Sequence, residues 1–228
     1  MNPLDYETTT GYTLGIVASD GEQSSTATLT VTVLDENEFA PAFQGGNIFS
    51  VNEEEQNGTL VGAVMATDAD GDPRNNQITY SFVQQTIYFT IDSSSGEIRT
   101  MERLNREMLT QVFIPPVSQL RLDVTAQDSA SPSRQTTRSI TITLVDINDN
   151  SPVFTDNTFE NSLLENQPAG QTVFQVSATD SDLGTNAQIS YSFALNEHTE
   201  DASLFTICLL YTSPSPRDAT LSRMPSSA

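Results

Sequence analysis

The sequence predicts an all-β fold, built as a tandem array of seven-stranded β-sandwiches of about 110 residues each. Two patterns lead to this prediction. Acidic residues recur at a domain-sized interval, because Asp35 and Asp146 lie 111 positions apart and Asp68 and Asp180 lie 112 positions apart. Apolar and polar residues also alternate along much of the chain, which is typical of half-buried antiparallel strands. The interval is too long for solenoid repeats of about 20–50 residues, so each repeat is a domain.

We expect the array to hold one complete repeat, over residues 40–150. Residues 1–39 match the C-terminal part of a repeat, and residues 151–207 match the N-terminal part of another. The stretch "GYTLGIVASDG" near the start recurs as "QLRLDVTAQDS" in the middle repeat, with Asp20 and Asp128 at equivalent positions. The chain is therefore expected to be a fragment of a longer array.

The strands follow in order along the repeat. Regular alternation covers residues 27–33, 120–127 and 140–145, where one face of each strand is apolar. Shorter runs, "TLVGAVMAT", "QITYSF", "YFTI" and "GEIRT", bring the middle repeat to about seven strands. Turn-forming stretches such as "DGDPRNN" and "DSSSGE" lie between them. Since no stretch has the period of an amphipathic helix, no helix is expected.

The charge balance excludes several classes of function. The chain carries a formal net charge of −21, with nine arginines and no lysine. So acidic a chain repels nucleic acid and anionic membranes, and it is typical of a cation-binding or halotolerant surface. No apolar run reaches the roughly 18 residues that span a bilayer, so any membrane attachment is expected through a segment outside this sequence. The single cysteine, Cys208, allows no disulfide within the chain.

Two similar stretches rich in oxygen-bearing side chains lie at the ends of the middle repeat. They are "LDENEFAPAF" over residues 34–43 and "LVDINDNSPVF" over residues 144–154. Calcium takes about six to eight oxygen ligands from carboxylates, amides and backbone carbonyls, and these stretches offer all three kinds. In an extended segment neighbouring side chains point to opposite sides, so Asn148 and Asp149 can serve different ions. Further ligands must come from loops elsewhere, because one linker cannot coordinate several ions alone.

Five motifs in a fixed order make the sequence resemble the extracellular repeats of the cadherin superfamily. In the middle repeat they are "EEEQNGT", "DAD", "LNRE", "AQD" and "DINDNSPVF". The third unit supplies "ENQPAGQTVFQVSATDSDLGTNAQISYSF", and the resemblance covers about residues 1–207. It implies Greek-key β-sandwiches joined by calcium-binding linkers.

Carried over position by position, the resemblance implies two joints that bind calcium ions (Ca²⁺). The first would be formed by Asp5, Glu7, Asp35, Glu36, Asn37, Glu38, Phe39, Asp68, Asp70, Asn75 and Asp128. The second would be formed by Glu53, Glu107, Asp146, Ile147, Asn148, Asp149, Asn150, Asp180, Asp182 and Asn186. Backbone oxygens are expected from Glu36, Phe39, Asn75, Ile147, Asn150 and Asn186. Asp20 is expected to belong to a joint that precedes the first.

The sequence departs from the family pattern at three places. Asn105 stands in "LNRE" where the family usually has aspartate, which removes one carboxylate from the second joint. Glu38 and Phe39 replace an aspartate and an asparagine in the first linker. About eight additional residues follow Glu107, within residues 108–119, and they bear on how that glutamate is placed.

The resemblance implies calcium-dependent cell–cell adhesion, by a calcium-rigidified ectodomain of a single-pass protein at the plasma membrane. The expected partner is another cadherin-type ectodomain, in a homophilic or heterophilic complex. The alternative is a calcium-stiffened spacer in a secreted or microbial adhesin. No enzyme is expected, since the paired acids of a glycosidase face a substrate cleft and do not recur at domain joints. "NGT" at Asn57 fits a glycosylation sequon.

The last 21 residues have a different character. After "LFTI" the third repeat should continue as the middle repeat does after "YFTI", with an acidic turn that contains glycine. It continues instead as "CLLYTSPSPRDATLSRMPSSA", of which "CLLYTSPSPRD" resembles a translated sequencing-library adapter. We therefore expect residues 208–228 to be a non-native tail and the gene to continue differently after Ile207; the alternative is a natural flexible tail.

Overall fold

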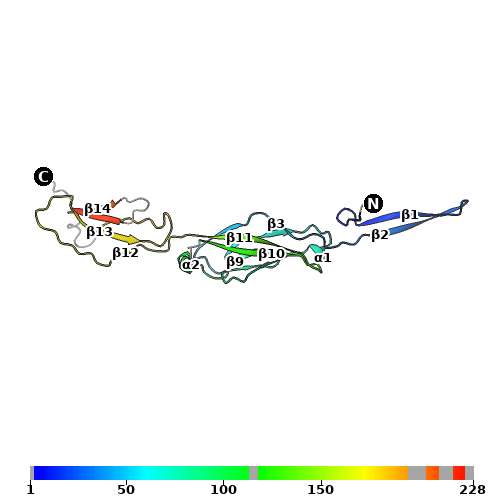
Figure 1. Ribbon diagram of the computed structural model, residues 1–228, viewed down its shortest axis with the longest axis horizontal. Coiled ribbons are helices and arrows are strands. Elements are labelled where there is room, and N and C mark those ends of the chain that lie inside the picture. The colour runs from blue at the N-terminus through cyan, green and yellow to red at the C-terminus, as the bar shows by residue number, and fades with distance from the viewer. Residues whose placement is uncertain (1–2, 113–117, 195–203, 211–217, 224–228) are drawn as a thin grey trace. The chain divides into compact units, whose positions relative to one another are not determined.

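A computed structural model describes residues 3–112, 118–194, 204–210 and 218–223 of the chain (Figure 1). The chain forms two compact units, Met1–Val145 and Asp146–Ala228, and each is described by itself. Both are built mainly of antiparallel strands, as the alternation of apolar and polar residues predicts. Among the described residues, no helix has the length and apolar character needed to cross a membrane.

The first unit begins with a long hairpin of β1 (Gly11–Ser19) and β2 (Ser24–Thr32). The strands pair antiparallel from Gly11 opposite Thr32 to Ser19 opposite Ser24. Asp20 closes the turn, because its carboxylate accepts hydrogen bonds from the backbone N–H groups of Glu22, at 3.0 Å, and Gln23, at 2.7 Å. These bonds, that from Gln23 first, lower the pKa of Asp20.

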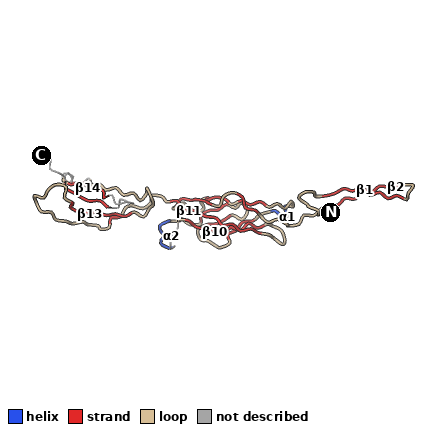
Figure 2. The backbone as a smooth tube through the Cα atoms, turned by 45° about the horizontal axis from the view of Figure 1, so that its top comes forward, coloured by secondary structure: helices blue, strands red, loops and turns tan. Residues whose placement is uncertain are grey.

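The middle repeat is a sandwich whose larger sheet has the strand order β4-β11-β10-β7. Its strands are β4 (Ile48–Asn52), β7 (Thr79–Phe82), β10 (Gln119–Gln127) and β11 (Gln135–Val145). β4 runs parallel to β11, and the other neighbours are antiparallel. Figure 2 shows this region as a set of aligned strands joined by loops.

The opposite face has the order β5-β9-β8, with a separate pair β3-β6. These strands are β3 (Ala42–Gln44), β5 (Leu60–Ala63), β6 (Met65–Thr67), β8 (Phe89–Ile91) and β9 (Glu97–Thr100). β3 and β4 are two parts of one strand that changes partner after Gly45, whose φ of +70° suits glycine. β5 and β6 likewise flank Val64, so the nine described segments correspond to the seven expected strands.

The core lies between these two faces and is formed by the residues that the alternation marks as inward-facing. Val124, Ile140 and Ile142 are 0% exposed, and they pack with Phe89 and Ile98 from the opposite face. Burying side chains of this size stabilises each by about 1.5–3 kcal/mol, so the middle repeat has a core of ordinary kind.

The expectation of no helix is wrong in two short stretches. In α1 (Pro73–Asn76), Asp72 caps the first turn by accepting from the N–H of Arg74 at 2.9 Å. In α2 (Arg106–Val112), the Oδ1 atom of Asn105 accepts from the N–H of Met108 at 2.8 Å. Both helices are too short to show a periodic pattern, and their side-chain caps fix them instead.

In the described residues of the second unit, four strands form a sheet in the order β12-β13-β15-β14. They are β12 (Val153–Phe154), β13 (Thr172–Thr179), β14 (Phe205–Leu210) and β15 (Asp218–Arg223). Part of the expected tail, residues 208–228, thus contributes backbone to β14 and β15. Its non-native origin concerns the gene and stays a prediction.

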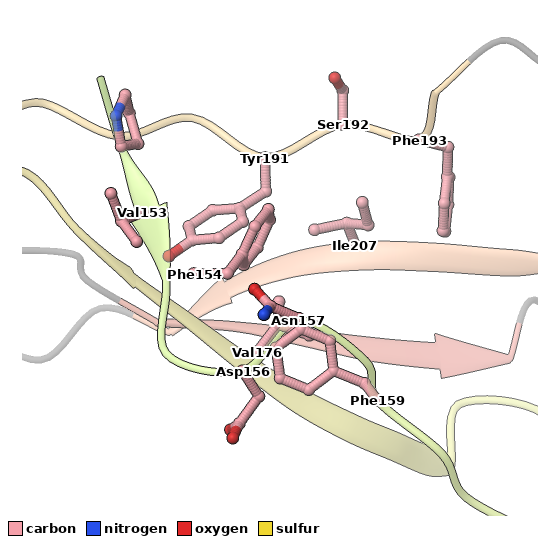
Figure 3. Close-up of a pocket in the computed structure, with 11 residues that line it drawn as sticks. Val153, Phe154, Asp156, Asn157, Phe159, Val176, Tyr191, Ser192, Phe193 and Ile207 are labelled. Atoms are coloured by element: carbon pink, nitrogen blue, oxygen red, sulfur yellow. The ribbon is translucent and has the colours of Figure 1, made fainter.

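The second unit has an open apolar cavity of about 550 Å³ (Figure 3). Figure 3 shows Tyr191 and Phe193 extending from one segment toward Phe154 and Ile207. Tyr191 accepts from the N–H of Ala178 at 3.0 Å, as Tyr80 accepts from the N–H of Ala66 at 2.8 Å, so the two frameworks correspond. The main lining residues of the cavity are Phe154, Phe159, Val176, Tyr191, Phe193 and Ile207.

Candidate metal centre

The first predicted joint brings the linker of residues 34–40 against the loop after β6, inside the first unit. The Oδ2 atom of Asp35 accepts from the backbone N–H of Asp72 at 2.9 Å and from the Nδ2 atom of Asn75 at 2.8 Å. The Oδ1 atom of Asp70 accepts from the N–H groups of Glu38 and Phe39, both at 3.2 Å. Each carboxylate is therefore held in place through one of its two oxygens.

Three more predicted ligands are fixed in the same way. The Oδ1 atom of Asp68 accepts from the N–H of Asp70 at 3.1 Å, and the Oε1 atom of Glu7 accepts from the N–H of Gly71 at 3.0 Å. Asn37 donates its Nδ2 hydrogen to the carbonyl of Pro132 at 2.8 Å. These bonds fix side-chain rotation and leave the second oxygen of each carboxylate, and the one side-chain oxygen of Asn37, free to bind another group.

Four side-chain oxygens at this joint are buried without a hydrogen-bond donor among the described residues. They are Asp35 Oδ1, Asn37 Oδ1, Asp68 Oδ2 and Asp70 Oδ2. A buried polar atom that lacks a partner costs about 1–3 kcal/mol, and more when it is charged. Four such oxygens at one joint fit a bound cation, because a cation can be coordinated by all of them where the described residues provide no hydrogen-bond donor.

The carboxylates are also close enough to share ions. One oxygen from each of Glu7, Asp35 and Asp70 lies within 4.8 Å of the others, and the same holds for Asp5, Glu7 and Glu38. Burial raises the pKa of Glu38, and a hydrogen bond with the Glu7 side chain and the charges of Glu7, Asp5 and Asp70 add to this effect.

The pKa of Asp68 is raised as well. Burial is the main cause, and the charges of Asp70 and Asp128 add to it. The site therefore resists carrying all of its negative charges without a counterion.

The remaining residues predicted for this joint have other tasks in the structure. Asp128 is buried, and its carboxylate accepts from the N–H groups of Ala130 and Arg134. Asp5 accepts from the N–H and hydroxyl of Thr8, and Glu36 is exposed. The side chain of Asn75 donates to Asp35, and the backbone oxygen expected from Asn75 as a ligand stays a prediction.

The remaining predicted ligand, Asp20, lies in the turn at the tip of the β1–β2 hairpin. Within the described part of the chain it belongs to no group of carboxylates close enough to share an ion. This agrees with the expectation that Asp20 serves a different joint, which stays a prediction.

The second unit repeats the network of the first joint at the equivalent positions. The Oδ2 atom of Asp146 accepts from the N–H of Leu183 at 3.0 Å and from the Nδ2 atom of Asn186 at 2.9 Å, as Asp35 does from Asp72 and Asn75. The Oδ1 atom of Asp180 accepts from the N–H of Asp182 at 3.0 Å.

Asp182 is 4% exposed and accepts from the side chain of Asn150 at 2.7 Å. The carboxylate of Asp182 also accepts from the backbone N–H of Asn150 at 3.4 Å, as the carboxylate of Asp70 accepts from the N–H of Phe39 in the first unit. Asn148 and Asp149 are exposed, and the N–H of Asp149 donates to the carbonyl of Ile147 at 3.0 Å.

Glu53 and Glu107, the other residues predicted for the second joint, lie together in the first unit. Glu53 is 1% exposed, and its Oε2 atom accepts from the N–H of Arg106 at 2.8 Å. The guanidinium of Arg106 lies 3.7 Å from Glu53 Oε1 and pairs with Glu107. Burial and the charge of Glu53 raise the pKa of Glu107 against the opposing effect of Arg106.

Two residues that are not among the predicted ligands help to build the site. Arg106 is buried between Glu53 and Glu107, and its place inside "LNRE" is the signal that could have identified it. Asp72 orients Asp35 through its N–H and holds α1 through its carboxylate, which Arg74 binds. That ion pair lowers the pKa of Asp72 to about 2.

Taken with the fold, these networks define a class of protein: tandem β-sandwiches whose linkers and loops carry repeated acidic sites. The cadherin domain family matches residues 47–145. The chain is 37% identical over 192 residues to the mouse cadherin EGF LAG seven-pass G-type receptor 1, a match that covers 84% of this chain. It is 40% identical over 212 residues to human protocadherin-15, a match that covers 88% of this chain. The chain belongs to the cadherin superfamily, as a fragment of its extracellular repeats.

The chain spans a small part of these relatives, 6% of the mouse receptor and 10% of human protocadherin-15. Solved structures have the same fold. The four-domain structure of protocadherin gamma B7 matches with a TM-score of 0.72 and 28% identity, over 97% of this chain and 50% of that one. The structure of mouse cadherin-23 EC22-24 matches with a TM-score of 0.70 and 25% identity, over 98% of this chain and 67% of that one. The prediction of an all-β cadherin fold is confirmed.

Proposed function

We propose that this chain is part of an adhesion ectodomain whose repeat joints bind calcium and are rigidified by it. The observation that carries this proposal is the set of four buried side-chain oxygens that lack a donor among the described residues at the first joint. A cluster of carboxylates from Glu7, Asp35 and Asp70 accompanies them.

The donor set suits calcium better than other common metals. It consists of carboxylate and amide oxygens, which calcium prefers, and it has no thiolate or imidazole of the kind that zinc favours. Without an ion, two unit charges about 5 Å apart repel by roughly 3 kcal/mol at an effective dielectric constant near 20. Bound calcium replaces this repulsion with attraction, so the linker becomes fixed against the loop that faces it.

The acidic residues of the other joint support the same chemistry. Asp146, Asp180 and Asp182 have the hydrogen-bond pattern of Asp35, Asp68 and Asp70, and we assign them, with Glu53, Glu107 and Asp149, to calcium binding as well. The repeat boundaries at residues 1–39, 40–150 and 151–207, and the non-native tail at 208–228, belong to this proposal. The proposed backbone ligands are the carbonyl oxygens of Glu36, Phe39, Asn75, Ile147, Asn150 and Asn186.

The adhesive role rests on family membership. The relatives are named as cadherins and protocadherins, and one is named as a seven-pass receptor, so the proposed location is the outer face of the plasma membrane. The proposed partner is another cadherin-type ectodomain, and no enzymatic activity is proposed. A calcium-stiffened spacer of a secreted or microbial adhesin remains the second candidate, because the same joints serve it equally.

Calcium titration of the chelator-treated chain tests the site. Calorimetry should detect binding in the wild type, and Asp70→Asn should weaken it by at least about tenfold, or 1.4 kcal/mol. Asp92→Asn, which alters an acid in the β8–β9 turn, is the matched control and should bind like the wild type. Absence of binding at millimolar calcium, or an Asp70→Asn titration equal to that of the wild type, would contradict the proposal.

Beads coated with the chain separate the two candidate roles. An adhesive segment should aggregate the beads in calcium and release them in chelator. A spacer should bind calcium without any aggregation of beads.

A further inference from the structure

Three charged side chains are buried together inside the middle repeat, where β4 ends and α2 begins. The side chains of this charged cluster, Glu53, Arg106 and Glu107, are 0%, 5% and 12% exposed. The Oε2 atom of Glu53 accepts from the backbone N–H of Arg106 at 2.8 Å, and the Nε atom of Arg106 lies 3.7 Å from Oε1 of Glu53. The Nη2 atom of Arg106 donates to Oε1 of Glu107. One guanidinium thus pairs with both glutamates.

The backbone around the charged cluster is anchored in the core. Leu104 and Leu109 lie on either side of Arg106 in the sequence, and they belong to the core at 5% and 6% exposure. The carbonyl oxygen of Leu104 accepts from the N–H of Glu54 at 2.7 Å, which ties the start of α2 to the turn that carries Glu53. The guanidinium of Arg106 is therefore part of the interior and not of a surface ion pair.

The charges of the cluster account for its place in the interior. The two carboxylates and the guanidinium sum to −1, whereas the two carboxylates alone would sum to −2. Burying a charge is costly unless an opposite charge lies close to it, and loss of one partner from a buried ion pair is strongly destabilising. Arg106 therefore provides the opposite charge that the two glutamates need when the chain folds.

The first joint balances its charge by other means. Residues 4–7 read "LDYE", so Tyr6 stands where "LNRE" has Arg106. Among the described residues, Asp35, Asp68 and Asp70 form no ion pair, and each has a buried oxygen without a hydrogen-bond donor. Under the proposed function a bound cation balances these aspartates, whereas the charged cluster already contains a cation of its own.

We propose that Arg106 is an internal counter-ion, which holds Glu53 and Glu107 in place without calcium and competes with calcium for them. This role rests on the proposed function, which assigns both glutamates to calcium binding. A calcium ion at these carboxylates faces the positive charge of Arg106 and its hydrogen bond to Glu107. Arg106 is therefore a positioning residue that also lowers the affinity of the two glutamates for calcium.

Scanning calorimetry of the full chain, in chelator and in calcium, tests this role. Arg106→Met has an unbranched side chain without charge, so it removes the counter-ion of two buried carboxylates. In chelator the first unit of this variant should melt about 10 °C or more below that of the wild type. Calcium should raise the melting temperature of Arg106→Met by more than that of the wild type, because the ion then binds without a competitor.

Arg103→Met, in the segment just before α2, is the matched control. The Arg103 side chain is 68% exposed, and its Nε atom lies 2.5 Å from Oε2 of Glu54. An exposed ion pair of this kind contributes little to stability. The control should therefore melt close to the wild type in chelator and show the same increase in calcium.

A double variant, with Glu107→Gln added to Arg106→Met, separates charge from packing. It returns the cluster to a charge of −1, so in chelator it should recover at least about half of the melting temperature that Arg106→Met loses. A loss caused only by the missing contacts of the arginine would not be recovered. The double variant also decides the matter if Arg106→Met does not fold in chelator.

The outcomes distinguish this role from the proposed function. Equal calcium shifts in Arg106→Met and the wild type overturn the competition, and a double variant no more stable than Arg106→Met overturns the counter-ion. In both cases calcium still stabilises the wild type, so the proposed function stands. A wild type whose melting temperature does not respond to calcium contradicts the proposed function, and the competition is then overturned with it.

Discussion

At the scale of single residues, the acidic side chains of the first joint divide their two oxygens between two tasks. One oxygen of Asp35, Asp68 and Asp70 accepts from backbone N–H groups or an amide, which fixes the side chain. The other is buried without a donor among the described residues. Such a division would orient each ligand before an ion binds at the proposed site, so that less side-chain entropy would be lost on binding.

A residue outside the joint gives a clean test of pH dependence. Asp92 accepts hydrogen bonds from the hydroxyl and N–H groups of Ser94 and Ser95, and these bonds, that from the Ser94 hydroxyl first, hold its pKa well below the ordinary value. Because the pKa is lower in the folded state, the charged carboxylate stabilises the fold above the unfolded pKa, near 3.9. That stabilisation is lost as the pH falls through the folded pKa.

The comparison of the wild type with Asp92→Asn isolates this effect. The variant keeps an acceptor oxygen but has no charge, so it should melt below the wild type at neutral pH. The difference in melting temperature should narrow as the pH falls below about 4. Calorimetric scans of both proteins across this range provide the measurement. A constant difference would show that the charge of Asp92 does not stabilise the turn.

At the scale of elements, the strands were predictable and the helices were not. The alternation over residues 120–127 and 140–145 requires only a period of two, and those residues form β10 and β11. The pattern does not show that the first strand divides into β3 and β4 with different partners, because partner choice depends on the whole sandwich. Nor does it show α2, whose start depends on a single side-chain cap.

The same limit applied to the metal site. Motif order predicts the side chains of the proposed site, since ligand type can be read from the sequence. It did not show which oxygen of each carboxylate is used by the backbone, nor that Arg106 lies between Glu53 and Glu107. Both depend on how the chain folds back on itself.

The cap of α2 leads to a prediction about Asn105, which replaces the usual aspartate of the family. Asn105→Ala removes the acceptor for the N–H of Met108 and should destabilise the first unit by about 0.5–2 kcal/mol. Asn105→Ser keeps a side-chain acceptor at the cap without adding a charge beside Glu54, and it serves as the matched control, with a smaller loss of stability than the alanine variant. Urea unfolding followed by circular dichroism measures both. Equal stability of the alanine variant would show that the asparagine does not cap this helix.

At the scale of the whole molecule, the net charge of −21 attracts the cation that the proposed function assigns to the joints. Raising the ionic strength shortens the screening length from about 30 Å at 0.01 M to about 8 Å at 0.15 M, so this long-range attraction weakens. The calcium affinity of the chain should therefore fall as sodium chloride is added, and calorimetric titrations at the two ionic strengths measure the change. Equal affinities would show that the charge of the whole chain does not contribute to binding.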